Sequence, residues 1–255
     1  MKILKVIIVF ISITTFCCFE NTIYAQANLF SYNKYKNQSG DSLLYRFLFP
    51  DANRSRKYPL VIFLHGSGER GNDNEAQLKW GVTNFATDYN LKMHPAFVIA
   101  PQCPANQSWG NSNFPDLTLK PTPTKQFELL VELIKETVQK FPIDTNRIYI
   151  TGLSMGGIGT FDIIARYPHL FAAALPVCGA GDTSYAAKTA HIPMWIVTGA
   201  EDPSVNPNLT LKMLQALVNA GAKPGYTQYP EVGHFSWIAA YSDPLIIEWL
   251  FRQHK

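Results

Sequence analysis

Short apolar segments alternate with longer segments of helical periodicity along most of the chain. The apolar segments occupy residues 59–64, 97–100, 147–151, 171–177, 194–198 and 226–229. Segments of this length with few polar interruptions are typical of strands buried on both faces of a parallel sheet. Residues 32–36 and 43–49 instead flank a polar turn, which predicts an antiparallel hairpin near the N-terminus.

Helices are predicted between these strands. Thr124 is a candidate N-cap, because apolar residues follow it at helical spacing as far as Val138, and Pro142 lies beyond them. Similar stripes occupy residues 158–165, 209–218 and 245–251. This alternation predicts an α/β fold with a mostly parallel central sheet, helices on both faces, antiparallel N-terminal edge strands and no large lid domain.

The composition fits one globular domain. The chain has 255 residues, of which 47% are hydrophobic and 16% charged, and this suffices for a single sizeable core. The net charge of +3 is spread along the chain. Without a basic run, we expect neither a nucleic acid nor a membrane surface as a partner.

The N-terminus has the pattern of a secretory signal peptide. A short positive segment at residues 1–5 precedes an apolar stretch at 6–19, and small residues follow it, with cleavage predicted after Ala25 or Ala27. An uncleaved anchor is the alternative, but the stretch is shorter than the roughly 20 residues that span a membrane. We therefore expect a secreted or periplasmic protein, with residues 1–25 removed, 26–255 as one catalytic domain and no stable membrane insertion.

The most informative motif is Gly-x-Ser-x-Gly at residues 152–156. It lies between the strand predicted at 147–151 and the helix predicted at 158–165. A serine on such a sharp strand-to-helix turn stands exposed above the sheet, and the glycines let the chain pass close to its neighbours. Ser154 is thus a candidate nucleophile, although an ordinary glycine-rich loop is the alternative.

A serine nucleophile needs a base that is oriented by a carboxylate. The predicted strand, sharp turn and helix resemble the nucleophile elbow of α/β-hydrolases, in which an acid and then a histidine follow the serine in the chain. His234 is the predicted base, because it follows the strand at 226–229, whereas His254 is the penultimate residue. Asp202 follows the strand at 194–198 and is the predicted acid, with Asp182 as the second choice and Glu201 expected to point elsewhere.

Two backbone amides are expected to form an oxyanion hole. Met155 follows the nucleophile at a helix N-terminus, and the loop after the strand at 59–64 contains Ser67 and Gly68. We predict the amides of Met155 and Ser67 as the donors, with Gly68 as the alternative to Ser67 and a substrate contact. His65 is predicted to be structural, and Glu69 and Arg70 either bind substrate or pair with each other.

Residues 101–123 form an unusually long connection that carries Trp109. It is either a wall of the substrate pocket or a surface loop anchored by its tryptophan. Trp109 and Trp237 are predicted to stack on a sugar or aryl ring of the substrate.

No cofactor or metal is expected. The remaining histidines lack metal-ligand spacing, and the chain has neither a phosphate-binding loop nor a dinucleotide fingerprint. Cys103 and Cys178, the cysteines beyond the signal peptide, are predicted to be buried free thiols, because sheet ends several strands apart do not allow a disulfide.

Five segments together carry a family resemblance: residues 64–71, 100–104, 152–157, 233–237 and 240–244. With them the chain resembles secreted, single-domain α/β-hydrolases of the esterase, phospholipase-carboxylesterase and prolyl-oligopeptidase-like type. The resemblance implies hydrolysis of carboxylic esters by a Ser154–His234–Asp202 triad. It further implies short or aryl acyl groups, including acetyl or feruloyl groups on polysaccharides, so the expected partner is a small-molecule or oligosaccharide ester.

Two other functions remain open at this point. A serine exopeptidase would use the same nucleophile. A non-catalytic glycan-binding module on a hydrolase scaffold belongs to another class, and it would normally have lost part of the triad.

Overall fold

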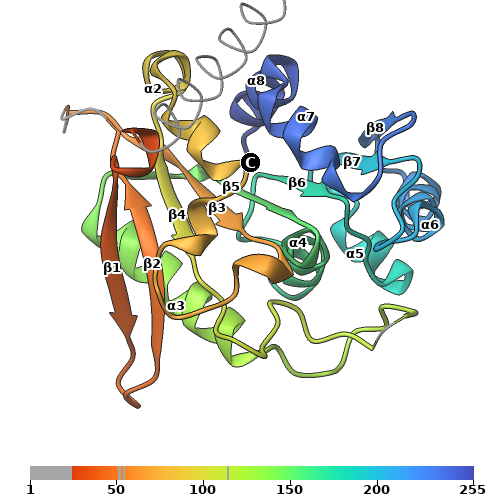
Figure 1. Ribbon diagram of the computed structural model, residues 1–255, viewed down its shortest axis with the longest axis horizontal. Helices are drawn as coiled ribbons and strands as arrows, with labels where there is room; N and C mark the ends of the chain where they lie inside the picture. The colour runs from red at the N-terminus through yellow and green to blue at the C-terminus, as the bar shows by residue number, and fades with distance from the viewer. Residues whose placement is uncertain (1–24, 51–52, 54, 114) are drawn as a thin grey trace, which may run out of the picture.

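The computed structural model describes residues 25–50, 53, 55–113 and 115–255, and these form an eight-stranded sheet in the order β1-β2-β4-β3-β5-β6-β7-β8. β1 and β2 are antiparallel to their neighbours and β3 to β8 run parallel to one another, as predicted (Figure 1). The strands are β1 (Phe30–Lys36), β2 (Ser42–Leu48), β3 (Tyr58–Leu64), β4 (Phe97–Pro101), β5 (Ile143–Leu153), β6 (Ala173–Val177), β7 (Trp195–Gly199) and β8 (Gly225–Tyr229).

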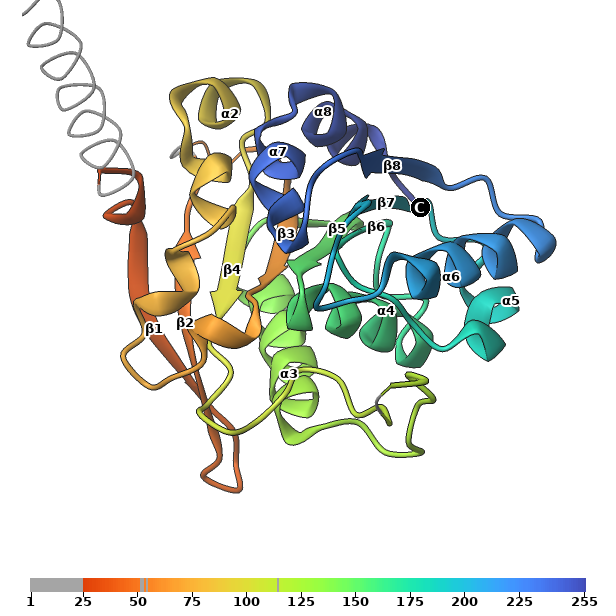
Figure 2. The same cartoon turned by 45° about the vertical axis from the view of Figure 1, so that its right-hand side comes forward.

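Helices cover both faces of the sheet. Those on one face are α3 (Lys125–Lys140), α4 (Met155–Arg166), α5 (Ala186–Thr189) and α6 (Pro207–Asn219), and those on the other are α2 (Asp88–Met93), α7 (Trp237–Ser242) and α8 (Pro244–Arg252) (Figure 2). Short 3-10 turns add η1 (Ser67–Glu69), η2 (Ala76–Leu78), η3 (Val82–Ala86), η4 (Thr183–Tyr185) and η5 (His234–Ser236). The predicted α/β architecture is confirmed.

Alternate residues of the central strands enter separate cores. In β3, Leu60 and Ile62 pack against the face that carries α3 and α4, whereas Val61 and Phe63 pack against the face that carries α7 and α8. Every residue of β3 is buried, which is why the strand reads as a continuous apolar segment in the sequence.

The start of α3 follows from a local signal in the sequence. The Thr124 hydroxyl accepts from the Phe127 amide and caps α3, as predicted. Apart from the helices that cover the sheet, the connections of the described residues contain only the short 3-10 turns η1 to η5 and irregular loops, with no separate lid domain. None of the helices in the described residues combines the length and the apolar composition of a membrane-spanning segment. The predicted signal peptide lies, apart from Ala25, outside the described residues.

Candidate active site

Ser154 stands at the turn between β5 and α4 with φ of 55° and ψ of −116°. A side chain pays a steric cost in this region of backbone space, and such strain persists only where the surroundings fix it. The surroundings here are tight: a Cβ on Gly156 would lie 2.0 Å from the Leu64 carbonyl oxygen, and one on Gly152 would lie 2.5 Å from that of Gly156. The two motif glycines therefore allow the close approach that lifts Ser154 above the sheet.

The loops after β5, β7 and β8 bring three side chains together at the carboxyl edge of the sheet. His234 Nε2 lies 2.7 Å from Ser154 Oγ, and His234 Nδ1 lies 2.7 Å from Asp202 Oδ2. Because the carboxylate accepts from Nδ1–H, Nε2 is left as the acceptor for the serine proton. The predicted nucleophile, base and acid thus form one hydrogen-bonded chain.

Asp202 is held as an anion. Its side chain is fully buried, and burial alone would raise its pKa. Hydrogen bonds from His234 and from the amides of Val205 and Ser204 outweigh burial and bring the pKa of Asp202 below its usual value. The ionised carboxylate fixes the imidazole and stabilises the imidazolium that forms when His234 takes the proton.

The other acid and base candidates lie elsewhere. The Asp182 carboxylate accepts from the amides of Ser184 and Leu119, so it caps η4 and ties down the connection after β4. Glu201 and His254 are exposed to solvent.

The loop after β3 approaches the nucleophile, since a Cβ on Gly66 would lie 3.6 Å from Ser154 Cβ. His65 holds this loop as predicted: its Nε2 accepts from the Cys103 amide at 2.9 Å, so its Nδ1 donates to the Gly66 carbonyl at 2.6 Å. In a trans peptide the N–H points opposite to the C=O, and the Ser67 amide therefore points away from His65. The oxyanion roles of Ser67 and Met155 stay predictions.

Of the two alternatives predicted for Glu69 and Arg70, the internal pair is not formed: among the described residues no ion pair joins them. Burial raises the pKa of Glu69, while Lys79, the amides of Gly66 and Glu69 and the Trp80 indole act against this rise. The carboxylate thus interacts with its own loop and with Trp80 rather than with the neighbouring guanidinium.

Residues 51–243 match the Phospholipase/Carboxylesterase family. The chain belongs to this family. It is 38% identical to a solved thermostable esterase, with a TM-score of 0.85, over 91% of this chain and 64% of that one. A curated relative, a bifunctional acetylxylan esterase/xylanase from Neocallimastix patriciarum, is 23% identical over 68% of this chain and 23% of its own length.

Solved peptidases are also similar to this chain. The acylaminoacyl peptidase of Pyrococcus horikoshii is 18% identical, with a TM-score of 0.63, over 89% of this chain and 42% of that one. At this identity the likeness shows a shared fold alone. This carboxylesterase-family chain spans about a quarter of the first curated relative and less than two thirds of the solved esterase.

Trp109 does not present its ring to substrate in this carboxylesterase-family chain. The side chain is 0% exposed, stacks on Phe127 and donates from Nε1 to the His65 carbonyl at 3.1 Å. The predicted stacking role of Trp109 is therefore wrong. Residues 101–123 contain an anchoring tryptophan, as in the alternative interpretation of this connection.

Aromatic side chains do gather beside the catalytic histidine. Trp237 packs edge-on against His234 with ring centroids 5.1 Å apart, but it is only 5% exposed, so it supports His234 and offers little surface to a ligand. Phe235 and Trp80 lie next to it and are more exposed. Sequence reasoning missed both, although the position of Phe235 directly after His234 was a usable signal. Gly68 is exposed, with open space where a Cβ would lie, and its contact with substrate stays a prediction.

Cys178 lies beneath the triad. Cys103 and Cys178 are buried free thiols, as predicted, and burial raises the pKa of each to about 12. Ligand atoms of Cys178, Asp202 and His234 lie within 4.8 Å of one another. Because Asp202 and His234 already bond to each other and the thiol stays protonated, this donor set fits the triad better than a metal.

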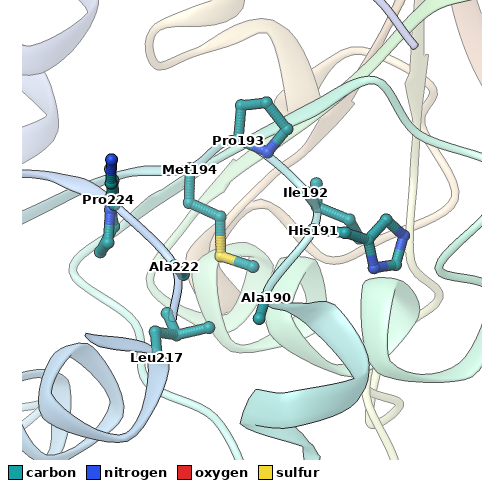
Figure 3. Close-up of a pocket in the computed structure, with 9 residues that line it drawn as sticks. Ala190, His191, Ile192, Pro193, Met194, Leu217, Ala222 and Pro224 are labelled. Atoms are coloured by element: carbon teal, nitrogen blue, oxygen red, sulfur yellow. The ribbon is translucent and has the colours of Figure 1, made fainter. Parts of the chain in front are cut away.

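A separate pocket of about 190 Å³ lies at the opposite, amino edge of β7. Met194 and Leu217 line it together with the turns at 190–193 and 222–224 (Figure 3). It contains no member of the triad. The catalytic groups of this carboxylesterase-family chain and this pocket thus lie at opposite edges of the sheet.

Proposed function

We propose that this protein is a serine hydrolase that cleaves carboxylic esters. The observation that carries the proposal is the double hydrogen bonding of His234, at 2.7 Å to Ser154 and at 2.7 Å to Asp202. A serine on a strained turn with an oriented base is the arrangement that acyl transfer needs.

In this mechanism His234 takes the proton of Ser154 as Oγ attacks the ester carbonyl carbon. The amides of Met155 and Ser67 hold the oxyanion. The carbon–alkoxy bond then breaks, and His234 gives its proton to the departing alcohol. Water attacks the acyl-enzyme with His234 as base again, and the acid leaves as Ser154 regains its proton.

The substrates proposed are esters of short or aryl acyl groups, including acetyl or feruloyl groups on oligosaccharides. Support comes from the acetylxylan-esterase activity in the name of a curated relative. The connections of the described residues form no separate lid domain, and this favours small acyl groups over long lipid chains, which usually need a covered apolar cavity. The signal-peptide pattern at residues 1–25 supports a secreted or periplasmic site of action.

The test is hydrolysis of p-nitrophenyl acetate by the wild type and by Ser154→Ala, with labelling by a fluorophosphonate probe as a second readout. We expect turnover and labelling in the wild type and loss of both in the variant. Equal rates in the two proteins would reject Ser154 as the nucleophile. Faster cleavage of aminoacyl nitroanilides than of matched esters would replace the esterase proposal by an exopeptidase.

A further inference from the structure

Trp80, Phe235 and Trp237 form what we call the aromatic wall. Ring centroids are 4.7 Å apart for Phe235 and Trp237, and 6.2 Å apart for Trp80 and each of the other two. The members differ in exposure: Trp237 is buried at 5%, Trp80 is half-buried, and Phe235 is 56% exposed. The wall therefore has a buried base and offers free ring surface through Phe235 and Trp80.

The wall is tied to the catalytic machinery on two sides. Trp237 packs against the His234 ring at 5.1 Å with an angle of 85° between the planes. Trp80 interacts with Glu69, whose carboxylate also interacts with the Gly66 amide in the loop that approaches Ser154. An exposed phenylalanine at this place stands beside the reacting groups rather than on a remote surface.

The reaction determines whether the acyl half or the alcohol half of the ester lies against the aromatic wall. In the first half-reaction the carbon–alkoxy bond breaks, and the proton on His234 Nε2 passes to the alkoxy oxygen. That oxygen must come within hydrogen-bond distance of His234, whereas the carbonyl oxygen goes to the oxyanion amides. The group attached to the alkoxy oxygen therefore lies next to His234, which is also where the wall lies.

We propose that Phe235 and Trp80 bind the ring of the alcohol half of the ester, and so select esters of cyclic alcohols. This inference rests on the proposed esterase function. An aryl ring and a pyranose ring both present a flat face of C–H or π surface to an aromatic side chain. The aromatic wall can therefore bind the ring of an aryl alcohol or of a sugar. The Lys79 ammonium, 5.3 Å from the Trp80 ring centroid, adds a hydrogen-bond donor at the outer end of the wall.

The experiment compares substrate preference in the wild type and in Phe235→Ala. The ring alcohols are phenyl acetate and an acetylated methyl xyloside, the acyclic reference is ethyl acetate, and ethyl cinnamate carries its ring on the acyl side. For each ring substrate the preference is its kcat/KM divided by that of ethyl acetate. Comparing this ratio between proteins cancels the intrinsic reactivity of the esters.

We expect Phe235→Ala to lower the preference for ring acetates about 3- to 10-fold, mainly through KM, as the loss of one aromatic contact predicts. Phe235→Tyr should restore it. A decrease confined to phenyl acetate identifies aryl alcohols as the source, and one confined to the xyloside identifies sugars. Tyr89→Ala is the matched control, because Tyr89 is 57% exposed but pairs with His94 instead of the wall.

Unchanged preference in Phe235→Ala would overturn the inference, and so would a decrease for ethyl cinnamate in place of the ring acetates. Failure of the esterase proposal has a different signature. In that case the wild type would hydrolyse none of the four esters faster than Ser154→Ala.

Discussion

Two histidines lie at the carboxyl edge of the sheet, and both use both ring nitrogens. His234 bridges a hydroxyl and a carboxylate, and 16% of its side chain is exposed. His65 bridges the Cys103 amide and the Gly66 carbonyl and is 1% exposed. Both follow strands of the same parallel set, so their difference comes from their partners rather than from their place in the fold.

The partners decide what each imidazole can do. His65 Nε2 already accepts from an amide, so it has no lone pair to offer a substrate, and burial lowers the pKa of His65 to about 4. His234 has a carboxylate behind it to stabilise a positive charge and a hydroxyl in front of it to deprotonate. In this protein the carboxylate behind His234 and the hydroxyl in front of it thus distinguish the base from the structural histidine.

The same substitution at both positions tests this contrast with the largest expected effect. His234→Gln should lower kcat/KM for p-nitrophenyl acetate by about 10⁴-fold, because no base remains. His65→Gln should lower it less than about tenfold at pH 7, because an amide side chain can accept from Cys103 and donate to Gly66.

Steady-state kinetics measure both effects, and melting temperatures check that each variant folds. Comparable losses in the two variants would show that His65 takes part in proton transfer, which would contradict the division of roles.

Replacing the carboxylate behind His234 should have the next largest effect. In Asp202→Asn the amide keeps the shape of the side chain, but its N–H₂ can donate to Nδ1 and so favours the wrong tautomer of His234. We expect kcat to fall about 10³- to 10⁴-fold. Glu201→Gln serves as the control, because it neutralises the adjacent but exposed acid. An Asp202→Asn enzyme with nearly full activity would remove Asp202 from the triad.

The sequence predicted what depends on local pattern and chain order. Strands such as β3 and β7 begin and end within one residue of the predicted segments, since their side chains are buried on both faces. The three triad residues could be predicted for the same reason, because each follows a strand that is recognisable in the sequence. β5 begins at Ile143, earlier than predicted; its start was missed because the residues that follow, 144–147, are polar and partly or fully exposed, so no apolar segment joins Ile143 to the rest of the strand.

Features that depend on contacts between distant residues were not predictable. Trp109 looks the same in sequence whether it anchors a loop or faces substrate. Its burial follows from Phe127 and from the His65 carbonyl, 44 positions away. Trp80 lies between 3-10 turns, which lack helical periodicity, and it comes to His234 only through the tertiary fold.

The depressed pKa of His65 makes stability depend on pH. In the unfolded chain this histidine takes up a proton near pH 6.5, but in the folded protein only near pH 4. Between these values the unfolded state binds more protons, so the free energy of unfolding falls as the pH is lowered through this window, by up to about 3 kcal/mol.

Denaturant unfolding at pH 7 and pH 4.5 measures this decrease. His65→Gln does not titrate, so its stability should fall less over the same interval, and the difference between the two proteins isolates the histidine from other groups. Identical pH slopes would contradict a buried neutral His65.

The smallest effect concerns the tryptophan behind His65. Trp109→Phe keeps an aromatic ring against Phe127 but removes the hydrogen bond from Nε1 to the His65 carbonyl. We expect a loss of stability of about 1 to 2 kcal/mol, because a buried acceptor is left without that donor.

Trp195→Phe is the matched control, since it also loses one indole hydrogen bond, to Thr227, but at a partly exposed site in β7. Unfolding measurements should show a larger loss for Trp109→Phe, with kcat/KM changed less than about threefold in both variants because neither indole touches the reacting atoms. A large loss of activity in Trp109→Phe with little loss of stability would instead mean that this hydrogen bond sets the position of the loop containing Gly66, and His65 would then be linked to catalysis through its backbone.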